Sequence, residues 1–289
     1  MVKHFPEAGK HVFQLRRRGP MQTSVYQQNT SPRKHQTFAN VLIRYWMLWF
    51  SLLYGMYVSL PFLAPLLMHW GAELPARWIY TFYSFLCHQL PERSYFLFGP
   101  KVSYNLTEIQ SAWQATSNPL ILRQFIGNPE MGWKVAWSDR MVAMFTSILL
   151  FAWLWWPLRR RIRQLHWIGL ILLALPMVVD GTTHLVSDLF GLHAGFRYTN
   201  DWLAVLTNHA LPASFYQGDA WGSFNAWMRL ITGGLFGLGI VWFGFPYLDQ
   251  IFTAEARLTE LKGLAKEKVI EQAFAAPGTE APNFRAKQQ

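Results

Sequence analysis

Four long apolar runs constrain the fold of this chain more than any other feature. They cover about residues 45–68, 140–156, 166–186 and 227–247. An α-helix needs roughly 20 residues to cross the ~30 Å hydrocarbon layer of a membrane, and inside lipid the backbone must satisfy its own hydrogen bonds. The sequence therefore predicts an all-α integral membrane bundle of four transmembrane helices, with interfacial helices in the long outer loop that contains residues 78–90.

The composition agrees with a membrane protein. The 289 residues are 52% hydrophobic and 17% aromatic but only 15% charged, which is more apolar than an average soluble domain. A net charge of +10 would suit nucleic acid only if the basic residues gathered on one exposed face. Here they gather at the ends of the apolar runs, so the expected partner is the lipid bilayer and not nucleic acid. The single cysteine, Cys87, excludes an internal disulfide and a zinc site built from several thiolates.

The basic residues predict the orientation. Four arginines between residues 159 and 163 follow the second run, and residues 1–40 carry seven Lys or Arg against one Glu. The positive-inside rule places both segments in the cytoplasm. We therefore expect a basic flexible arm over residues 1–40, a four-span domain over 41–248, and a charged helix with a disordered end over 249–289. Both termini are then cytoplasmic, and the predicted location is the bacterial inner membrane.

This topology brings polar residues from four separate segments to the outer ends of the helices. Polar and ionisable side chains at membrane depth are costly unless they pair with one another or have a function. The sequence therefore predicts a binding or structural polar cluster there. Its members are Cys87, His88, Glu92, Arg93, Ser138, Asp139, Arg140, Asp180, His184, Asp188, Arg197, Thr199, Asn200, Asp201, Arg229 and Thr232.

Within the third run, Asp180, His184 and Asp188 are spaced four residues apart and share one face of a helix. Two carboxylates and an imidazole are ligand types that a divalent metal ion accepts. The same row also suits ion pairs with arginines of the other segments. We favour the ion pairs, because arginines are present in matching number and a metal ion would compete with them. The available arginines are Arg140, Arg197 and Arg229.

An enzyme is the main alternative. A metal-assisted hydrolase or transferase acting on a lipid would use His184, Asp188 and His88 as ligands or acid–base groups, whereas the loop histidines His193 and His209 are better explained by contact with water or the interface. The spacing His184-x-x-x-Asp188 echoes the last motif of lipid-phosphate phosphatases. The Ser-Arg pair and the Pro-Ser-Gly-His segment of that family do not occur here, so the sequence assigns no catalytic residue and no cofactor.

Several short motifs occur together in a fixed order. They are Cys87-His88-Gln89-Leu90-Pro91-Glu92-Arg93-Ser94, Asp180-Gly181, Thr199-Asn200 and Arg229-Leu230-Ile231-Thr232-Gly233. Over about residues 80–239 the chain thereby resembles a family of bacterial integral membrane proteins catalogued as domain of unknown function 2085. Members of that family show Cys-x-Arg-Cys at the entry to the second span, where this chain has Ser138-Asp139-Arg140-Met141. The resemblance implies a divergent branch with the same fold and an important polar cluster, but no reaction.

We therefore expect a multi-pass membrane protein whose outer-face Asp/His/Arg cluster stabilises the bundle and recognises a lipid head group, a quinone or a partner subunit. Arg93, Arg140, Arg197 and Arg229 would donate hydrogen bonds to an anion. A further alternative is an accessory subunit of a respiratory or photosynthetic membrane complex. In that case the basic arm and the glycine-rich fourth run would dock other subunits or a second copy of the chain.

Overall fold

The computed structural model describes residues 40–275, and within this range the chain is mostly helical. The four apolar runs form α2 (Trp46–His69), α6 (Asp139–Leu158), α7 (Trp167–Asp188) and α11 (Phe224–Ala275). All four helices are long and apolar enough to cross a membrane, which confirms the predicted fold class. The predicted basic arm, up to residue 39, and the predicted disordered end, from residue 276, lie outside the described residues.

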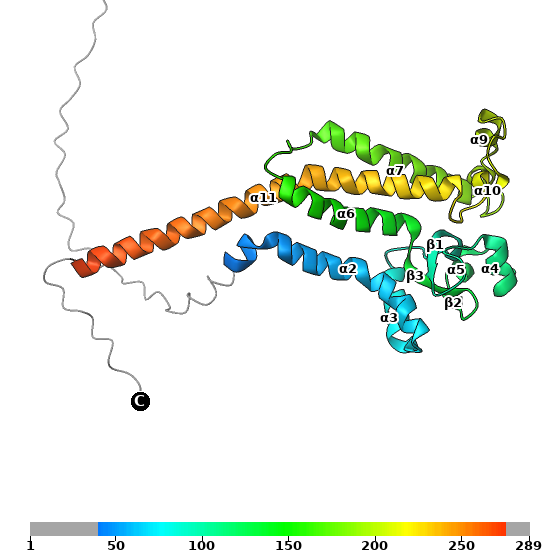
Figure 1. Ribbon diagram of the computed structural model, residues 1–289, viewed down its shortest axis with the longest axis horizontal. Helices are drawn as coiled ribbons and strands as arrows, with labels where there is room; N and C mark the ends of the chain where they lie inside the picture. Colours follow the sequence, from blue (N-terminus) through cyan, green and yellow to red (C-terminus); the bar gives the residue numbers. More distant parts are fainter. Residues whose placement is uncertain (1–39, 276–289) are drawn as a thin grey trace, which may run out of the picture. The chain divides into compact units, whose positions relative to one another are not determined.

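Three of the long helices pack side by side. α11 lies along both α6 and α7 (Figure 1). At Gly237 of α11, an added Cβ would stand 2.0 Å from Ser147 Oγ and 3.1 Å from the Met144 carbonyl oxygen of α6. An added side chain would have to displace Ser147, so Gly237 allows α11 to approach α6 closely.

The outward surfaces of these helices are apolar. Ile171, Leu172, Val178 and Val179 of α7 are all about half exposed or more. A soluble monomer rarely leaves a continuous apolar surface of this kind in water. Together with the length of the helices, this surface is the physical basis for contact with a lipid bilayer.

A small sheet, which the sequence did not predict, precedes α6. Strands β1 (Ser94–Leu97), β2 (Gly127–Asn128) and β3 (Gly132–Ser138) are antiparallel in the order β1-β3-β2. Their register pairs Ser94 with Ser138, at the place where β3 runs directly into α6. The strands are short and are interrupted by a bulge, so their period-two pattern is too brief to distinguish them from loop.

The remaining elements are short and lie outside the four apolar runs. α3 (Glu73–Ser84) exposes Trp78 and Phe82, as expected of a helix at a membrane interface. The others are η1 (Pro91–Arg93), α4 (Leu106–Ala112), α5 (Pro119–Leu122), α8 (Phe196–Thr199), α9 (Asp201–Leu206) and α10 (Ala213–Tyr216).

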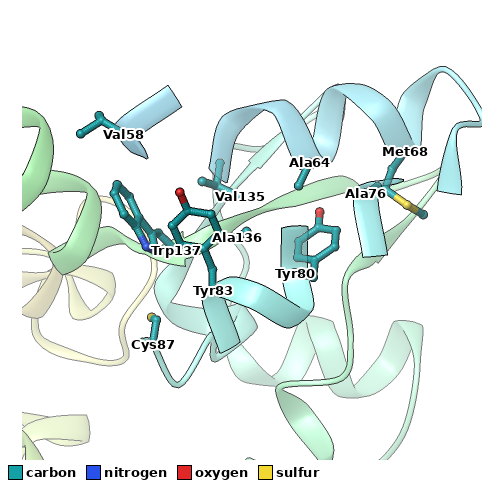
Figure 2. Packing of buried hydrophobic residues seen from close by; sticks show 10 residues of the cluster. All are labelled: Val58, Ala64, Met68, Ala76, Tyr80, Tyr83, Cys87, Val135, Ala136 and Trp137. Carbon is teal, nitrogen blue, oxygen red and sulfur yellow. The ribbon is translucent and has the colours of Figure 1, made fainter. Parts of the chain in front are cut away.

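A buried cluster between α2, α3 and β3 fixes the start of α6. Figure 2 shows Trp137 of β3 beside Tyr83 of α3, and their ring centroids are 5.3 Å apart. The Tyr83 hydroxyl donates to the Tyr57 carbonyl of α2 at 2.6 Å, and the Tyr80 hydroxyl donates to the Lys134 carbonyl of β3 at 2.5 Å. These contacts hold the last residues of β3, and therefore the first turn of α6, in one position.

Candidate functional site

The polar residues gather where α6 and α11 begin and α7 ends, at the opposite end of these helices from the arginine-rich turn after α6. The sheet brings the segment that precedes β1 to the same place. Ser94 of β1 pairs with Ser138 of β3 in antiparallel register. Arg93, which precedes Ser94, therefore lies close to Asp139, which follows Ser138. Segments far apart in the sequence therefore supply one network of charged side chains.

One part of this network is closely paired. Arg93 binds Asp188 with two parallel bonds of 2.6 and 2.7 Å and gives its Nε–H to Asp219 at 2.9 Å. Arg229 gives its Nε–H to Asp139 at 2.8 Å and its two Nη groups to the carboxylate and the carbonyl of Asp219, both at 2.6 Å. We call these five residues the closed half of the network. Every guanidinium nitrogen in it has an acceptor.

Asp219 is the centre of the closed half, and the sequence analysis did not select it. It lies in the loop between α10 and α11, after Gly218 with φ +80°. Burial would raise the pKa of Asp219, but the guanidiniums of Arg93 and Arg229 hold it well below its ordinary value. The carboxylate is therefore ionised and joins two arginines from different segments. The only sign of this role in the sequence is the position of the carboxylate, ten residues before Arg229 and among apolar residues.

The other part of the network, which we call the open half, consists of Arg140, Asp180, His184 and Arg197. Arg140 Nη2 donates to Asp180 Oδ2 at 2.6 Å, and Arg197 Nη2 donates to Asp180 Oδ1. Arg197 Nη2 also lies 3.1 Å from His184 Nε2. A guanidinium can only donate, so Nε2 accepts and the imidazole proton is on Nδ1. Among the described residues, His184 Nδ1, Arg140 Nε and Arg197 Nε have no acceptor.

Arg197 is held by the loop that follows α7. The Arg197 backbone N–H donates to Ser187 Oγ at 2.9 Å, and an added Cβ at Gly195 would lie 2.1 Å from that same oxygen. The Arg197 carbonyl accepts from the side chains of Asn200 and Asn225 at 2.7 and 2.6 Å. Asn200 itself has φ +46°, a conformation that asparagine tolerates better than most residues. These contacts fix the guanidinium beside Asp180.

A cavity of about 190 Å³ opens next to both halves. His88 is accessible from it, and His88 Nδ1 accepts the Leu90 N–H at 3.1 Å, which leaves the proton on Nε2. The protein packed around the imidazole lowers its pKa to about 3, and Arg93, Arg140 and Arg229 add to this effect. The lining residues are Leu86, Cys87, His88, Arg93, Ser138, Asp139, Arg140, Met141, His184 and Arg229.

Two further ionisable groups are buried near the closed half. Glu92 is 3% exposed, and neither of its carboxyl oxygens has a hydrogen-bond partner in the part of the chain that the structure describes. Burial raises the pKa of Glu92 to about 7, against the opposing effect of Arg93. Burial also lowers the pKa of Lys134 to about 7, and its ammonium donates to the carbonyls of Gln89 and Arg123 at 2.8 and 2.7 Å.

The other predicted residues fall into two groups. Cys87 Sγ lies 3.4 Å from Ser138 Oγ at the edge of the cavity. Thr199 and exposed Asp201 bond to each other and take no part in the network, while the Thr232 hydroxyl donates to the Met228 carbonyl of its own helix. The pairing also differs in one respect from the prediction, because Arg229 binds Asp139 and Asp219 instead of the carboxylates of α7.

The row of Asp180, His184 and Asp188 is divided between the two halves. Asp180 accepts from two arginines and Asp188 accepts from Arg93. Across residues 40–275 there is no group of three or more His, Cys, Asp or Glu residues placed to hold a metal ion. The geometry of the row is that of an ion-pair network.

Comparison with known proteins identified no relative of this chain. No protein-family model matches the chain. No curated protein and no solved structure matches it either. The role of the site is therefore argued from its own geometry.

Proposed function

We propose that this chain is a multi-pass membrane protein that binds the anionic head group of a membrane lipid in the cavity beside Arg140. The observation that carries the proposal is the surplus of donors in the open half. Two guanidiniums share one carboxylate there, and Arg140 Nε and His184 Nδ1 are buried without an acceptor among the described residues. A buried donor without an acceptor is costly, so a ligand that supplies acceptors is favoured.

The chemistry of the cavity selects an oxyanion. His88 Nε2–H and His184 Nδ1–H are both donors, and the carboxylate of Asp139 is already held by Arg229. The N-terminal turn of α6 also borders the cavity, and a helix N-terminus attracts negative charge. A phosphate or carboxylate group accepts hydrogen bonds at every oxygen and suits a space of about 190 Å³. A neutral quinone has only two carbonyl acceptors, so it would satisfy fewer of these donors than an oxyanion does.

The resemblance to the domain of unknown function 2085 family remains part of this proposal. In the motif of that family a cysteine would stand at position 138, and here Ser138 Oγ is 3.4 Å from Cys87 Sγ. A cysteine at position 138 would therefore lie beside Cys87. In this chain the retained arginine, Arg140, faces the cavity.

We also propose that the cavity faces outward from the cytoplasm of a bacterial cell. The arginines that follow α6 lie at the other end of the helices, and the positive-inside rule supports a cytoplasmic position for them. A periplasmic reporter enzyme fused after Gly218 should be active, and the same reporter fused after Arg161 should be inactive. The reverse pattern would contradict this orientation.

The head-group proposal is tested by lipid retention. The protein is purified into nanodiscs that contain equal amounts of phosphatidylglycerol and phosphatidylcholine, and the lipids retained after detergent extraction are counted by native mass spectrometry. We expect retention of phosphatidylglycerol over phosphatidylcholine, and Arg140→Gln should reduce this preference about tenfold, because a charge-assisted hydrogen bond is removed. Excess inorganic phosphate should not displace the lipid if the head group is the ligand.

Arg77→Gln is the matched control. Arg77 lies on α3 and pairs only with Glu73 on the exposed surface, so its loss should leave the preference unchanged. Equal retention of the two lipids by the unmodified protein, or an unchanged preference in Arg140→Gln, would contradict the proposal. Displacement by inorganic phosphate would assign the cavity to free phosphate.

A further inference from the structure

A second opening lies on the other side of Asp180. It is a groove of about 530 Å³ between α7 and α11, and Leu175, Pro176, Val179 and Met228 form its apolar walls. Asp180 and Arg197 lie at its polar end together with Phe224 of α11. The groove is distinct from the cavity, because Arg197 lines the groove whereas Arg140 lines the cavity.

Almost every polar group along the groove is already satisfied. The hydroxyl of Thr183 donates to the Val179 carbonyl at 2.8 Å, and that of Thr232 donates to the Met228 carbonyl at 2.7 Å. Arg197 is the exception. Its side chain is 9% exposed, and its Nε has no acceptor within the described part of the chain. A charged donor that is also bonded to Asp180 thus stands at the end of a largely apolar groove.

We infer that this groove binds an anionic amphiphile with one acyl chain. Its head group accepts from the guanidinium of Arg197, and its chain lies along α7 and α11 against Val179 and Met228. The charge of the head group complements Arg197, while the apolar walls fit a hydrocarbon chain and the exposed flank of α7 allows entry from the lipid phase. The inference goes beyond the proposed head-group site, because it needs a different arginine and a different space.

The test uses photoactivatable palmitate with a diazirine in the middle of the acyl chain, added to the protein in phosphatidylcholine nanodiscs. After irradiation we expect the labelled peptides to come from α7 and α11. Unlabelled palmitate should compete about tenfold more strongly than methyl palmitate, which has the same chain without the charge. Lysophosphatidate is a further competitor. Stronger competition by palmitate would identify the head group as a carboxylate, and stronger competition by lysophosphatidate would identify it as a phosphate.

Two tryptophan substitutions form a matched pair. Met228→Trp fills the groove and should reduce labelling about tenfold. Ile171→Trp adds the same bulk to an exposed position of α7 outside the groove and should leave labelling unchanged. Circular dichroism and thermal unfolding establish that both variants are folded. If Met228→Trp does not fold, the competition between palmitate and methyl palmitate in the unmodified protein decides.

Equal competition by methyl palmitate, or labelling spread evenly over α2 as well, would overturn the inference. Arg140→Gln separates the two sites. It should retain full palmitate labelling, because Arg140 does not line the groove, even where it has lost the preference for phosphatidylglycerol. Loss of both properties together would contradict two separate sites.

Discussion

The closed and open halves of the network contain the same residue types but differ in how completely they are paired. In the closed half, Asp139, Asp188 and Asp219 surround two arginines, and every guanidinium nitrogen has an acceptor. In the open half, two arginines share Asp180 and three buried nitrogens lack a partner among the described residues. The closed half therefore has surplus negative charge and the open half has surplus positive charge.

This difference separates a structural role from a binding role. A buried ion pair contributes little net stability compared with an apolar pair of the same shape, but the loss of one member is costly because the other charge is left unpaired. The closed half joins η1, α6, α7 and α11, so it specifies how these elements meet. The open half leaves donors directed at a cavity and a groove, where a ligand can complete it.

The largest expected effect follows from Asp219→Ala. The change removes the acceptor that Arg93 and Arg229 share and leaves two buried guanidiniums underpaired. We expect the free energy of unfolding to fall by about 3–5 kcal/mol, measured by thermal or denaturant unfolding of the protein in detergent micelles.

The control is Asp201→Ala. Asp201 is exposed and bonds only to Thr199 at 2.9 Å, so its loss should change the stability by about 0.5 kcal/mol or less. Equal losses in the two variants would contradict the distinction between network and surface carboxylates. If Asp219→Ala were as stable as the unmodified protein, the closed half would have no structural role.

The sequence was sufficient to predict the helices and the location of the cluster. Runs of about 20 apolar residues have one structural solution in lipid, and a spacing of four places Asp180 and His184 on one face. Positive-inside reasoning predicted that the polar ends of these helices lie together, and in the structure Arg229 binds Asp139 and is joined to Arg93 through Asp219. Each of these steps depends on local pattern or on membrane geometry.

The individual partners could not be predicted from local pattern. Which arginine meets which carboxylate depends on the register of β1 with β3, and strands of four to seven residues with a bulge give too weak a signal. Asp219 follows a glycine in a loop and has the same local sequence as a solvent-exposed turn. Lys134 lies among apolar residues of β3, and this short stretch gives no sign that its side chain is fully buried.

Glu92 provides the second prediction, because it is a carboxylate beside the closed half that is not part of it. Its pKa rises from about 4.5 in the unfolded chain to about 7 in the folded protein. The stability associated with this group is therefore fully present below pH 4.5 and is lost as the pH rises towards 7. Glu92→Gln keeps the shape without the charge, so above pH 7 the variant should be more stable than the unmodified protein by up to about 3 kcal/mol.

The measurement is the free energy of unfolding of both proteins between pH 4 and pH 9. The two curves should meet near pH 4, where Glu92 is protonated in both states. Lys134 titrates in both proteins, but Glu92 raises the pKa of Lys134, so the difference between the curves includes this coupling. The exposed Glu130→Gln variant should follow the unmodified protein at every pH. A pH-independent difference between Glu92→Gln and the unmodified protein would contradict the raised pKa of Glu92, and a variant that is less stable than the unmodified protein above pH 4.5 would show that Glu92 has an ionic partner.

The smallest expected effect concerns the contact between α6 and α11 that brings Asp139 to Arg229. In Gly237→Ala the added Cβ would meet Ser147 Oγ at 2.0 Å and the Ile148 backbone nitrogen at 3.1 Å. Ser147 can rotate away, but it then loses its bond to the Gly233 carbonyl. We expect a loss of about 1 kcal/mol in unfolding free energy, measured under the same conditions as for Asp219→Ala.

Gly234→Ala is the matched control, because nothing lies within 4 Å of its added Cβ, and alanine should be neutral or slightly stabilising there. The lipid-retention experiment also measures whether this pair of variants affects the open half. Arg140, Asp180 and Arg197 belong to α6, α7 and α8 and not to α11, so Gly237→Ala should keep the preference for phosphatidylglycerol while it loses stability. If the preference fell together with the stability, the open half would depend on the contact between α6 and α11, and the two halves would have to be treated as a single unit.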